Sequence, residues 1–369
     1  MIRKSLVIGT VLVLSACGGS GGGGGNADNG LLTGQFTDLG IEGVRYQTQS
    51  QSGLTDEDGR FQYYPGETVD FWVGNLQIGS AVPAAPYITL LDMTEASRAQ
   101  LNAGGVNDQG LSDHRPVEDA LTSDLYISNL TRLMLTLDDD RGASANSNIR
   151  FSERDIAQFN VQLEAIGGTL DLTVPNDEFA NKTTLSPANQ ILKSICFFPE
   201  DDFRCGEPPT QAEIDAAPPR PQVAEDIDPD ITYREDLIQR QRSIEDSKRT
   251  LDLTSLDRVR TYLLQQANAY NAKLGEPYFL SDFAVNIPAG DQAIRRLTVE
   301  SFKGDVILDN LVVISTNPQA VTVHSSSAQL RTVEYYATGA AGTESTLLIN
   351  FRLPGEYRWI RKSVRVRVI

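Results

Sequence analysis

Histidine and cysteine, which often serve as catalytic bases, nucleophiles and metal ligands, are scarce in this sequence. Among its 369 residues there are two histidines, His114 and His324, and three cysteines. A catalytic nucleophile needs a base and an orienting group close by, and a chain with no helical pair of histidines and no phosphate-binding loop offers few candidates. We therefore expect a protein that is not an enzyme.

Basic residues are also in deficit. The chain has 32 Lys and Arg against 49 Asp and Glu, which gives a formal net charge of −17 at pH 7. Removing Arg3 and Lys4 with an N-terminal signal leaves 30 basic against 49 acidic residues and a charge of −19. Such a surface is soluble and is repelled by nucleic acids and anionic lipids. We expect no nucleic-acid partner, and a membrane attachment that depends on acyl chains.

The N-terminal apolar stretch is too short to span a membrane. Arg3 and Lys4 form a positive region, and the apolar stretch from Leu6 to Leu14 has nine residues. As a helix it would reach roughly 14 Å, against a hydrocarbon core of about 30 Å. This pattern is typical of a secretory signal that is cleaved off.

At the end of this stretch, Leu14-Ser15-Ala16-Cys17 resembles the lipobox of bacterial lipoproteins. The resemblance implies that residues 1–16 are a lipoprotein signal peptide and that Cys17 is lipidated and becomes the first mature residue. Gly18, rather than an aspartate, follows the cysteine, which implies an outer-membrane address facing the periplasm or the cell surface. The alternative is an ordinary signal peptide with a chance cysteine at its cleavage point.

Residues 17–30 have almost no side chains to pack, because glycine dominates the segment. A glycine-rich coil of this length has a typical span of about 20 Å. We expect a flexible tether that holds a folded protein away from a bilayer.

The remaining two cysteines, Cys196 and Cys205, lie close together in "CFFPEDDFRC". In an exported protein the natural interpretation is a disulfide bond. The alternative is a pair of metal ligands, but neither histidine lies nearby in the sequence. We expect the disulfide, followed by a proline-rich acidic linker, over residues 196–230.

Residues 31–95 alternate apolar and polar positions and are punctuated by turn residues, a pattern that predicts short strands in hairpins. We expect a small β-sandwich here. Its aromatic residues Tyr63, Tyr64 and Trp72 have two interpretations. They either fill the core or form an exposed strip that binds a glycan or a protein.

The segment "GLTDEDGRFQYYPGE" resembles the Thr-Asp-x-x-Gly-x-Phe/Tyr hallmark of prealbumin-like and carboxypeptidase-regulatory-like sandwiches. Together with its flanks it looks like a module at the start of uncharacterised proteobacterial lipoproteins. The likeness continues through "NLTRLMLTLDDDRGASANSNIRF", residues 129–151, and extends to about residue 195. The likeness implies a fold and a cellular location, but no particular catalytic activity. We expect residues 96–195 to be mainly helical.

An acidic turn follows the helix predicted in that segment. Asp138, Asp140 and Asn146 would supply the oxygen ligands that Ca²⁺ prefers. However, no EF-hand register fits, and Arg141 intrudes among them. The alternative is a solvated end of the helix.

The last third of the chain divides into helices and strands. We expect two helices over residues 231–276, the second capped by Thr254 and ended by Gly275. Residues 277–369 contain about seven short strand patterns, which suit an immunoglobulin-like β-sandwich.

The C-terminus is basic. Arg358, Arg361 and Lys362 precede Arg365 and Arg367, and the last two alternate with valines. We expect one apolar face and one basic face on this strand. Arg365 and Arg367 then either contact an anionic partner, such as lipid phosphates or an acidic protein, or protect the edge of a sheet from aggregation.

These observations predict a β-rich α+β multidomain protein, with a prealbumin-like sandwich, a helical middle region and an immunoglobulin-like sandwich. We expect a non-enzymatic binding, adhesion or assembly module of the cell envelope, joined to the membrane by its lipid and recognising an envelope protein or glycan. The alternative is a hydrolase acting on glycan or ester substrates through a carboxylate site. With 49 acidic residues, no pair of carboxylates stands out in the sequence.

Overall fold

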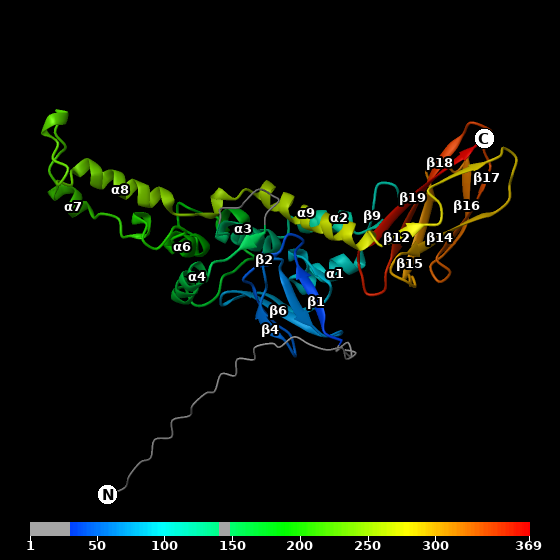
Figure 1. Ribbon diagram of the computed structural model, residues 1–369, viewed down its shortest axis with the longest axis horizontal. Helices are drawn as coiled ribbons and strands as arrows, with labels where there is room; N and C mark the ends of the chain where they lie inside the picture. Colours follow the sequence, from blue (N-terminus) through cyan, green and yellow to red (C-terminus); the bar gives the residue numbers. More distant parts are fainter. Residues whose placement is uncertain (1–29, 140–147) are drawn as a thin grey trace, which may run out of the picture.

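The computed structural model describes residues 30–139 and 148–369 and shows a mixed α+β, β-rich chain of more than one domain. This coarse fold class is the one that the sequence predicts. Figure 1 shows an arm around α7 (Gln211–Ala216) and α8 (Arg234–Ser247) at one end, a body of strands and helices in the middle, and a set of C-terminal sheets at the other end. Within the described ranges no helix is long and apolar enough to span a bilayer.

Residues 30–95 form short strands, as their alternating sequence predicts. In β6 (Thr68–Val73) Val69, Phe71 and Val73 are buried, while the residues between them are half-buried. The other strands of this part are β1 (Leu32–Phe36), β2 (Ile41–Glu42), β3 (Arg45–Gln47), β4 (Ser52–Leu54), β5 (Arg60–Tyr63), β7 (Leu76–Pro83) and β8 (Tyr87–Ile88). They pair in the orders β4-β3-β6-β7 and β5-β1-β8, and β2 pairs with β11 (Ile149–Arg150).

The Thr-Asp-x-x-Gly motif makes the turn before β5. Asp56 accepts hydrogen bonds from the backbone N–H of Asp58 and of Arg60, at 3.0 and 2.8 Å. Gly59 has φ +71°, and a Cβ there would lie 2.4 Å from the carbonyl oxygen of Phe36. Because this conformation and this space exclude a side chain, the turn requires glycine.

Helices cover these strands and share one apolar core with them. They are α1 (Glu95–Ala103), α2 (Arg115–Leu121), α3 (Leu125–Leu137), α4 (Glu153–Ala165), α5 (Asn176–Phe179) and α6 (Pro187–Ser194), with the short hairpin β9 (Gly105–Val106) and β10 (Ser112–Asp113) between α1 and α2. Leu130, Leu133, Met134 and Leu137 of α3 are buried, as their helical spacing predicts. We refer to these strands and helices as the body.

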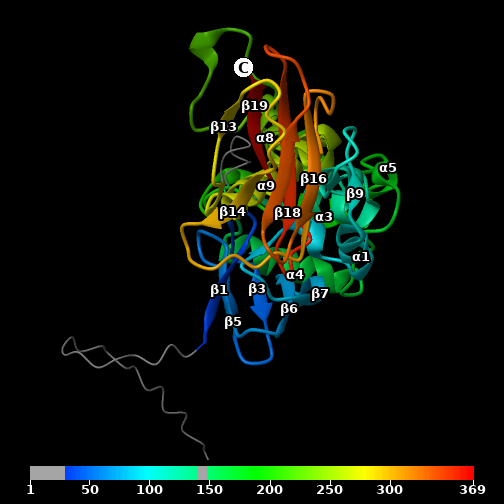
Figure 2. The same ribbon diagram turned by 90° about the vertical axis from the view of Figure 1, so that its right-hand side faces the viewer.

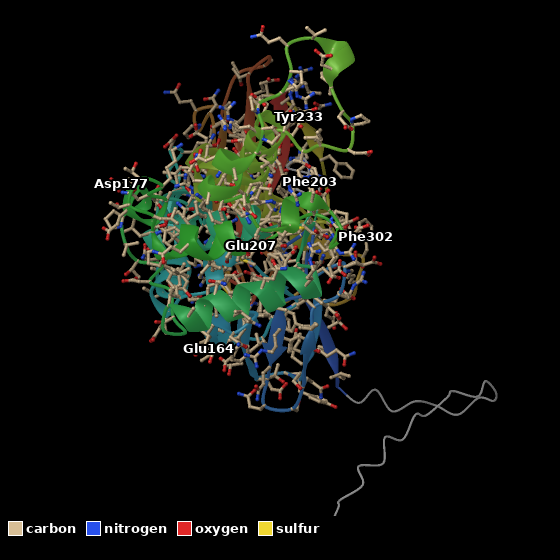
Figure 3. All side chains as sticks on the ribbon, turned by 90° about the vertical axis from the view of Figure 1, so that its left-hand side faces the viewer. Glu164, Asp177, Phe203, Glu207, Tyr233 and Phe302 are labelled. Atoms are coloured by element: carbon tan, nitrogen blue, oxygen red, sulfur yellow. A yellow bond between two sulfur atoms is a disulfide. The ribbon has the colours of Figure 1, made fainter. Side chains whose placement is uncertain are left out.

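The arm runs from Cys196 to Thr250 and projects away from the body (Figure 1). It contains η2 (Phe203–Cys205), α7, η3 (Ala224–Asp226) and α8, and it returns to the body through η4 (Leu251–Leu253). Figure 3 looks at the molecule from the arm side, with Phe203 and Tyr233 labelled.

Helix α9 (Leu256–Gly275) links the body to the C-terminal sheets. Val259, Leu263 and Ala267 lie in the core of the body, while Leu274 near its end packs against the second core. The expected cap at Thr254 is wrong by one residue, because the hydroxyl of Ser255 accepts the hydrogen bond from the Arg258 N–H. Thr254 is buried, and its hydroxyl bonds that of Thr136 at 2.9 Å.

The C-terminal strands form two four-stranded sheets, in the orders β12-β14-β17-β16 and β13-β19-β18-β15. The strands are β12 (Tyr278–Leu280), β13 (Ala284–Ile287), β14 (Arg295–Ser301), β15 (Asn310–Ser315), β16 (Val321–Ser327), β17 (Thr332–Ala337), β18 (Glu344–Arg352) and β19 (Trp359–Val368). Both sheets contribute side chains to a second apolar core. Figure 2 shows this end of the molecule facing the viewer, with β18 and β19 side by side.

Candidate functional site

A buried cluster of polar and charged side chains joins the body to the C-terminal sheets. The loop between β18 and β19 leaves the second core and inserts Tyr357 into the core of the body. Arg358, the next residue, is buried beside His114 and Glu118 of the body. We call Asp113, His114, Glu118, Tyr357 and Arg358 the joint.

The sequence around α2 explains how the body supplies its share of the joint. Pro116 lies in the first turn of α2, where its missing N–H costs no intrahelical hydrogen bond. Asp113 accepts a hydrogen bond from the Arg115 N–H at 3.2 Å. Glu118 follows His114 by four residues, so the two side chains lie on the same face of the helix.

His114 is locked in its neutral form. Its Nδ1 atom accepts a hydrogen bond from the backbone N–H of Trp359 at 2.9 Å, so this nitrogen carries no proton. Nε2 must then carry the proton of the neutral ring, and it faces Glu118 Oε2 at 3.6 Å. Burial lowers the pKa of His114 to about 3, although Asp113 acts in the opposite direction.

Glu118 is surrounded by groups from both sides of the joint. Its Oε1 atom accepts a hydrogen bond from the Tyr357 hydroxyl at 3.1 Å and lies 3.7 Å from Arg358 Nε. Burial raises the pKa of Glu118 to about 7, and the positive charge of Arg358 opposes that rise. The carboxyl group therefore changes its charge near neutral pH.

Arg358 is the central cation of the joint. Its Nη1 atom contacts Glu356 Oε1 at 3.1 Å, and Nη2 lies 3.8 Å from Asp92 Oδ2. Burial acts to lower the pKa of Arg358, yet the groups around it raise the pKa above the usual arginine value. A buried charge is tolerated only when it is paired in this way.

A second set of contacts surrounds the joint. Arg361 of β19 donates a hydrogen bond to Asp113 Oδ2 at 3.0 Å and another to Asn350 Oδ1 at 3.1 Å. The Asn350 amide donates to the carbonyl of Ser112 at 2.8 Å, and Lys362 Nζ donates to the carbonyl of Gly275 at 3.0 Å. Polar bonds thus hold β18 and β19 to β10 and to the end of α9.

The joint is built to hold two parts of the chain in a fixed relation. The side chains of His114, Glu118 and Arg358 are between 0 and 3% exposed, so almost none of their surface is open to solvent. Among residues 30–139 and 148–369, no group of three or more His, Cys, Asp or Glu side chains is placed to bind a metal ion. The chemistry that this arrangement supports is proton binding and charge pairing.

The predicted bond between Cys196 and Cys205 is confirmed. It lies at the base of the arm, where the Cys196 N–H donates to Gln158 Oε1 of α4 at 2.8 Å. Arg154 of the same helix donates to the carbonyl oxygens of Cys196 and Phe198. The disulfide therefore closes the loop that anchors the arm to the body.

Other expected site residues fall partly outside the described ranges. The lipidation site Cys17 lies outside them, as do Asp140 and Asn146 of the hypothetical calcium site. Asp138, the third member of that site, is buried at the end of α3, and its Oδ1 atom accepts a hydrogen bond from the Arg150 N–H at 3.0 Å.

Arg365 and Arg367 lie side by side on β19, with their side chains 56% and 51% exposed. Both pair with Glu344 Oε2, at 2.6 and 3.5 Å. The alternative that they protect an edge strand is wrong, because β19 lies between β13 and β18.

The aromatic residues of the N-terminal strands take different positions. Tyr63 is buried in the core of the body, as the core interpretation predicts. Trp72 is half-buried, with the guanidinium of Arg45 4.2 Å from its ring centre.

The sequence did not reveal the joint. His114 was recognised only as one of two histidines, and Arg358 was grouped with the basic residues of the last strand. Two signals were present: the spacing of four residues between His114 and Glu118, and the aromatic neighbours of Arg358 in "EYRWI". Both are common in proteins, and neither states that the two segments meet.

Comparisons with known proteins place this chain in no family. No protein-family model matches the sequence, and no curated protein matches it significantly. Among solved structures, it is similar to domains 5–6 of the S-layer protein SbsC, with 19% identity, 25% of this chain and 42% of that chain covered, and a TM-score of 0.20. An endo-β-1,4-mannanase from Thermotoga petrophila is similar over 31% of this chain and 24% of that chain, with 13% identity and a TM-score of 0.17. The matched regions thus span less than half of either structure.

Proposed function

We propose that this protein is a cell-envelope lipoprotein that acts as a non-enzymatic binding, adhesion or assembly module. In this proposal Cys17 carries the lipid anchor in the outer membrane, and residues 17–30 form the tether. The N-terminal strands belong to a prealbumin-like sandwich, and the two C-terminal sheets to an immunoglobulin-like sandwich. The protein faces the periplasm or the cell surface.

The observation that carries this proposal is the joint. Because Tyr357 and Arg358 are buried in the body, the C-terminal sheets are held in place rather than hanging on a linker. If the protein is tethered to a membrane, the fixed C-terminal sheets present their surface at a high local concentration. Weak contacts are then enough for binding.

The C-terminal sheets carry aromatic side chains suited to such contacts. Phe283, between β12 and β13, is 81% exposed, and Phe302, directly after β14, is 80% exposed. The Phe302 ring stacks on that of Phe279 at 4.4 Å between centroids, so it is held in a defined orientation. Exposed aromatic groups of this kind are enriched in binding surfaces. The proposed partner is an envelope protein or glycan.

Arg365 and Arg367 add a second contact to this proposal. Both side chains reach solvent from β19 while they share Glu344. An anionic partner would have to compete with that carboxylate, so we propose a weak and salt-dependent contact.

The test compares retention of the full chain on purified envelopes with that of two variants. Phe283→Ser combined with Phe302→Ser should reduce retention at least about tenfold if these rings supply the contact. Val161→Ser is the matched control, because Val161 is also a well-exposed apolar residue (63%) but belongs to the body. It should bind like the unchanged chain.

Equal retention of all three proteins would contradict the proposed binding surface. The same proteins should be assayed for turnover of peptidoglycan, polysaccharide and ester substrates. Turnover that disappears when one carboxylate is changed, without any specific retention on envelopes, would favour the alternative function as a hydrolase.

A further inference from the structure

A small pocket lies beside the joint, between the body and the inserted loop. It has a volume of about 100 Å³ and is lined by three segments of the chain: residues 82–88, residues 92–102 and residues 355–358. The first two belong to the body, and the third belongs to the loop between β18 and β19. A molecule in this pocket would touch both parts that the joint connects.

The polar residues that line the pocket have unused hydrogen-bonding capacity. Arg358 is buried, and its Nε and Nη2 atoms have no hydrogen-bond partner among the described residues. The hydrogen bonds of Asp92 use Oδ2 and those of Glu356 use Oε1, and no described residue bonds the other oxygen of either carboxylate. Buried polar groups normally find partners, so the two Arg358 nitrogens point to a ligand that accepts hydrogen bonds. The free oxygens of Asp92 and Glu356, whose side chains are 13% and 20% exposed, offer acceptors for a ligand that also donates.

The charges around the pocket are balanced. Arg98 and Arg358 are positive, while Asp92 and Glu356 are negative. An anion would meet the two carboxylates and a cation would meet the two guanidinium groups, so a small ion gains little here. A neutral ligand with several hydroxyl groups avoids both conflicts, because a hydroxyl donates to a carboxylate and accepts from a guanidinium N–H.

The lining of the pocket also includes apolar residues. They are Val82, Pro83, Ala85, Tyr87, Ile88 and Leu101. Tyr87 is half-buried, and its ring lies 4.7 Å from that of Tyr270 of α9. A lining that combines apolar residues with a few polar groups is typical of small-ligand sites.

From this combination we infer that the pocket binds the neighbouring hydroxyl groups of a neutral sugar unit. The hydroxyls donate to Asp92 and Glu356 and accept from Arg358, while the C–H face of the ring packs on Tyr87. The inference rests on the proposed function for the source of the sugar, an envelope glycan. Because the ligand contacts the body and the inserted loop together, its binding tightens the joint.

The test measures binding of the methyl glycosides of glucose, galactose, mannose and N-acetylglucosamine to the full chain by ligand-observed NMR. We expect at least one of them to bind with a Kd of about 1 mM and to raise the midpoint of thermal unfolding. Glycine and acetate, tested alongside, represent ligands that carry charge, and we expect neither to bind.

A matched pair of variants locates the binding. Asn102 is exposed at the end of α1 and lines the pocket, so Asn102→Trp places a large side chain at the pocket without replacing any residue of the joint. Gln100 is also exposed on α1 but does not line the pocket, and Gln100→Trp is the control. We expect Asn102→Trp to weaken glycoside binding at least about tenfold, and Gln100→Trp to change it by less than about twofold.

Any of three results would overturn the inference. The first is that no glycoside binds at about 50 mM, far above the expected Kd. The second is that Asn102→Trp binds the glycoside as well as Gln100→Trp does, and the third is that glycine or acetate binds in place of the glycosides. The outcome is independent of the envelope test above, because Asn102→Trp leaves Phe283 and Phe302 unchanged. Loss of glycoside binding with normal retention on envelopes would separate the pocket from the exposed surface.

Discussion

Burial raises the pKa of Glu118 and lowers the pKa of His114. The folded pKa of Glu118 is about 7, above its ordinary value of 4.5, so folding favours the protonated acid and stability falls as the pH rises from about 4.5 to about 7. The folded pKa of His114 is about 3, below its ordinary value of 6.5, so folding favours the neutral ring and stability falls as the pH drops from about 6.5 to about 3. Between about pH 4.5 and 6.5 the two effects oppose each other.

We therefore predict that Glu118→Gln changes the pH dependence of stability above pH 6. Glutamine cannot ionise, so the loss of stability that the unchanged protein shows as the pH approaches 7 should disappear. Urea unfolding at intervals from pH 4 to pH 8 measures this. Glu356→Gln is the control, because Glu356 is also a carboxylate next to Arg358 but is more exposed. If the slopes of Glu118→Gln and the unchanged protein are the same above pH 6, Glu118 does not titrate there.

Arg358 and Arg365 allow a second comparison between single residues, that of a buried and an exposed ion pair. Arg358→Met removes a buried cation and leaves Glu118, Glu356 and Asp92 without their partner, so we expect a loss of about 3–5 kcal/mol in the free energy of unfolding. Arg365→Met removes an exposed pair with Glu344, and we expect a loss below about 1 kcal/mol. Denaturant unfolding of both variants at one pH gives the two values. Similar losses would mean that the joint contributes no more than a surface ion pair.

The contrast between these two arginines shows a limit of the sequence. Both belong to the same basic segment, and the local pattern assigns neither of them to a buried position. What separates them is whether the surrounding chain folds over them, which depends on α2, more than two hundred positions earlier. Tyr63 is a more local case: its alternation with Phe61 in β5 favours the core interpretation over the exposed strip, and Tyr63 is buried.

The attachment of the arm to the body depends on the disulfide bond between Cys196 and Cys205. We predict that replacing Cys196 and Cys205 together by serine lowers the free energy of unfolding by about 2–3 kcal/mol, because the short loop is no longer closed in the unfolded chain. Urea unfolding measures the loss, and limited proteolysis locates it. Cleavage should increase within residues 196–250 and stay unchanged in the C-terminal sheets. An unaltered cleavage pattern and an unaltered midpoint would contradict this role.

Element type was predicted better than element boundaries and neighbours. The periodicity of α3 and of β6 is strong, because each buries one face against a core, and both were expected. The cap of α9 was misplaced by one residue, because Thr254 and Ser255 are equally good caps and the choice depends on Thr136 in a distant helix. The position of β19 inside its sheet was missed, because strand order depends on pairing with β13, a long-range contact.

For the whole molecule, we predict that Cys17→Ala leaves the protein soluble or as an uncleaved precursor instead of bound to the outer membrane. A chain with a net charge of −17 has no electrostatic attraction to anionic lipid, so in the proposed function its attachment depends on the acyl groups. Fractionation of cells that produce either form measures this, with the unchanged protein as the control. A variant that still fractionates with outer membranes would show that the anchor lies elsewhere.

The inserted loop also sets the order in which the fold becomes complete. Tyr357 fills a place in a core made otherwise of residues 36–267, so the core of the body is not finished until the last part of the chain is present. A chain that is synthesised from its N-terminus therefore leaves apolar surface of the body uncovered until residue 357 has been added. A product that stops before residue 357 would keep that surface uncovered.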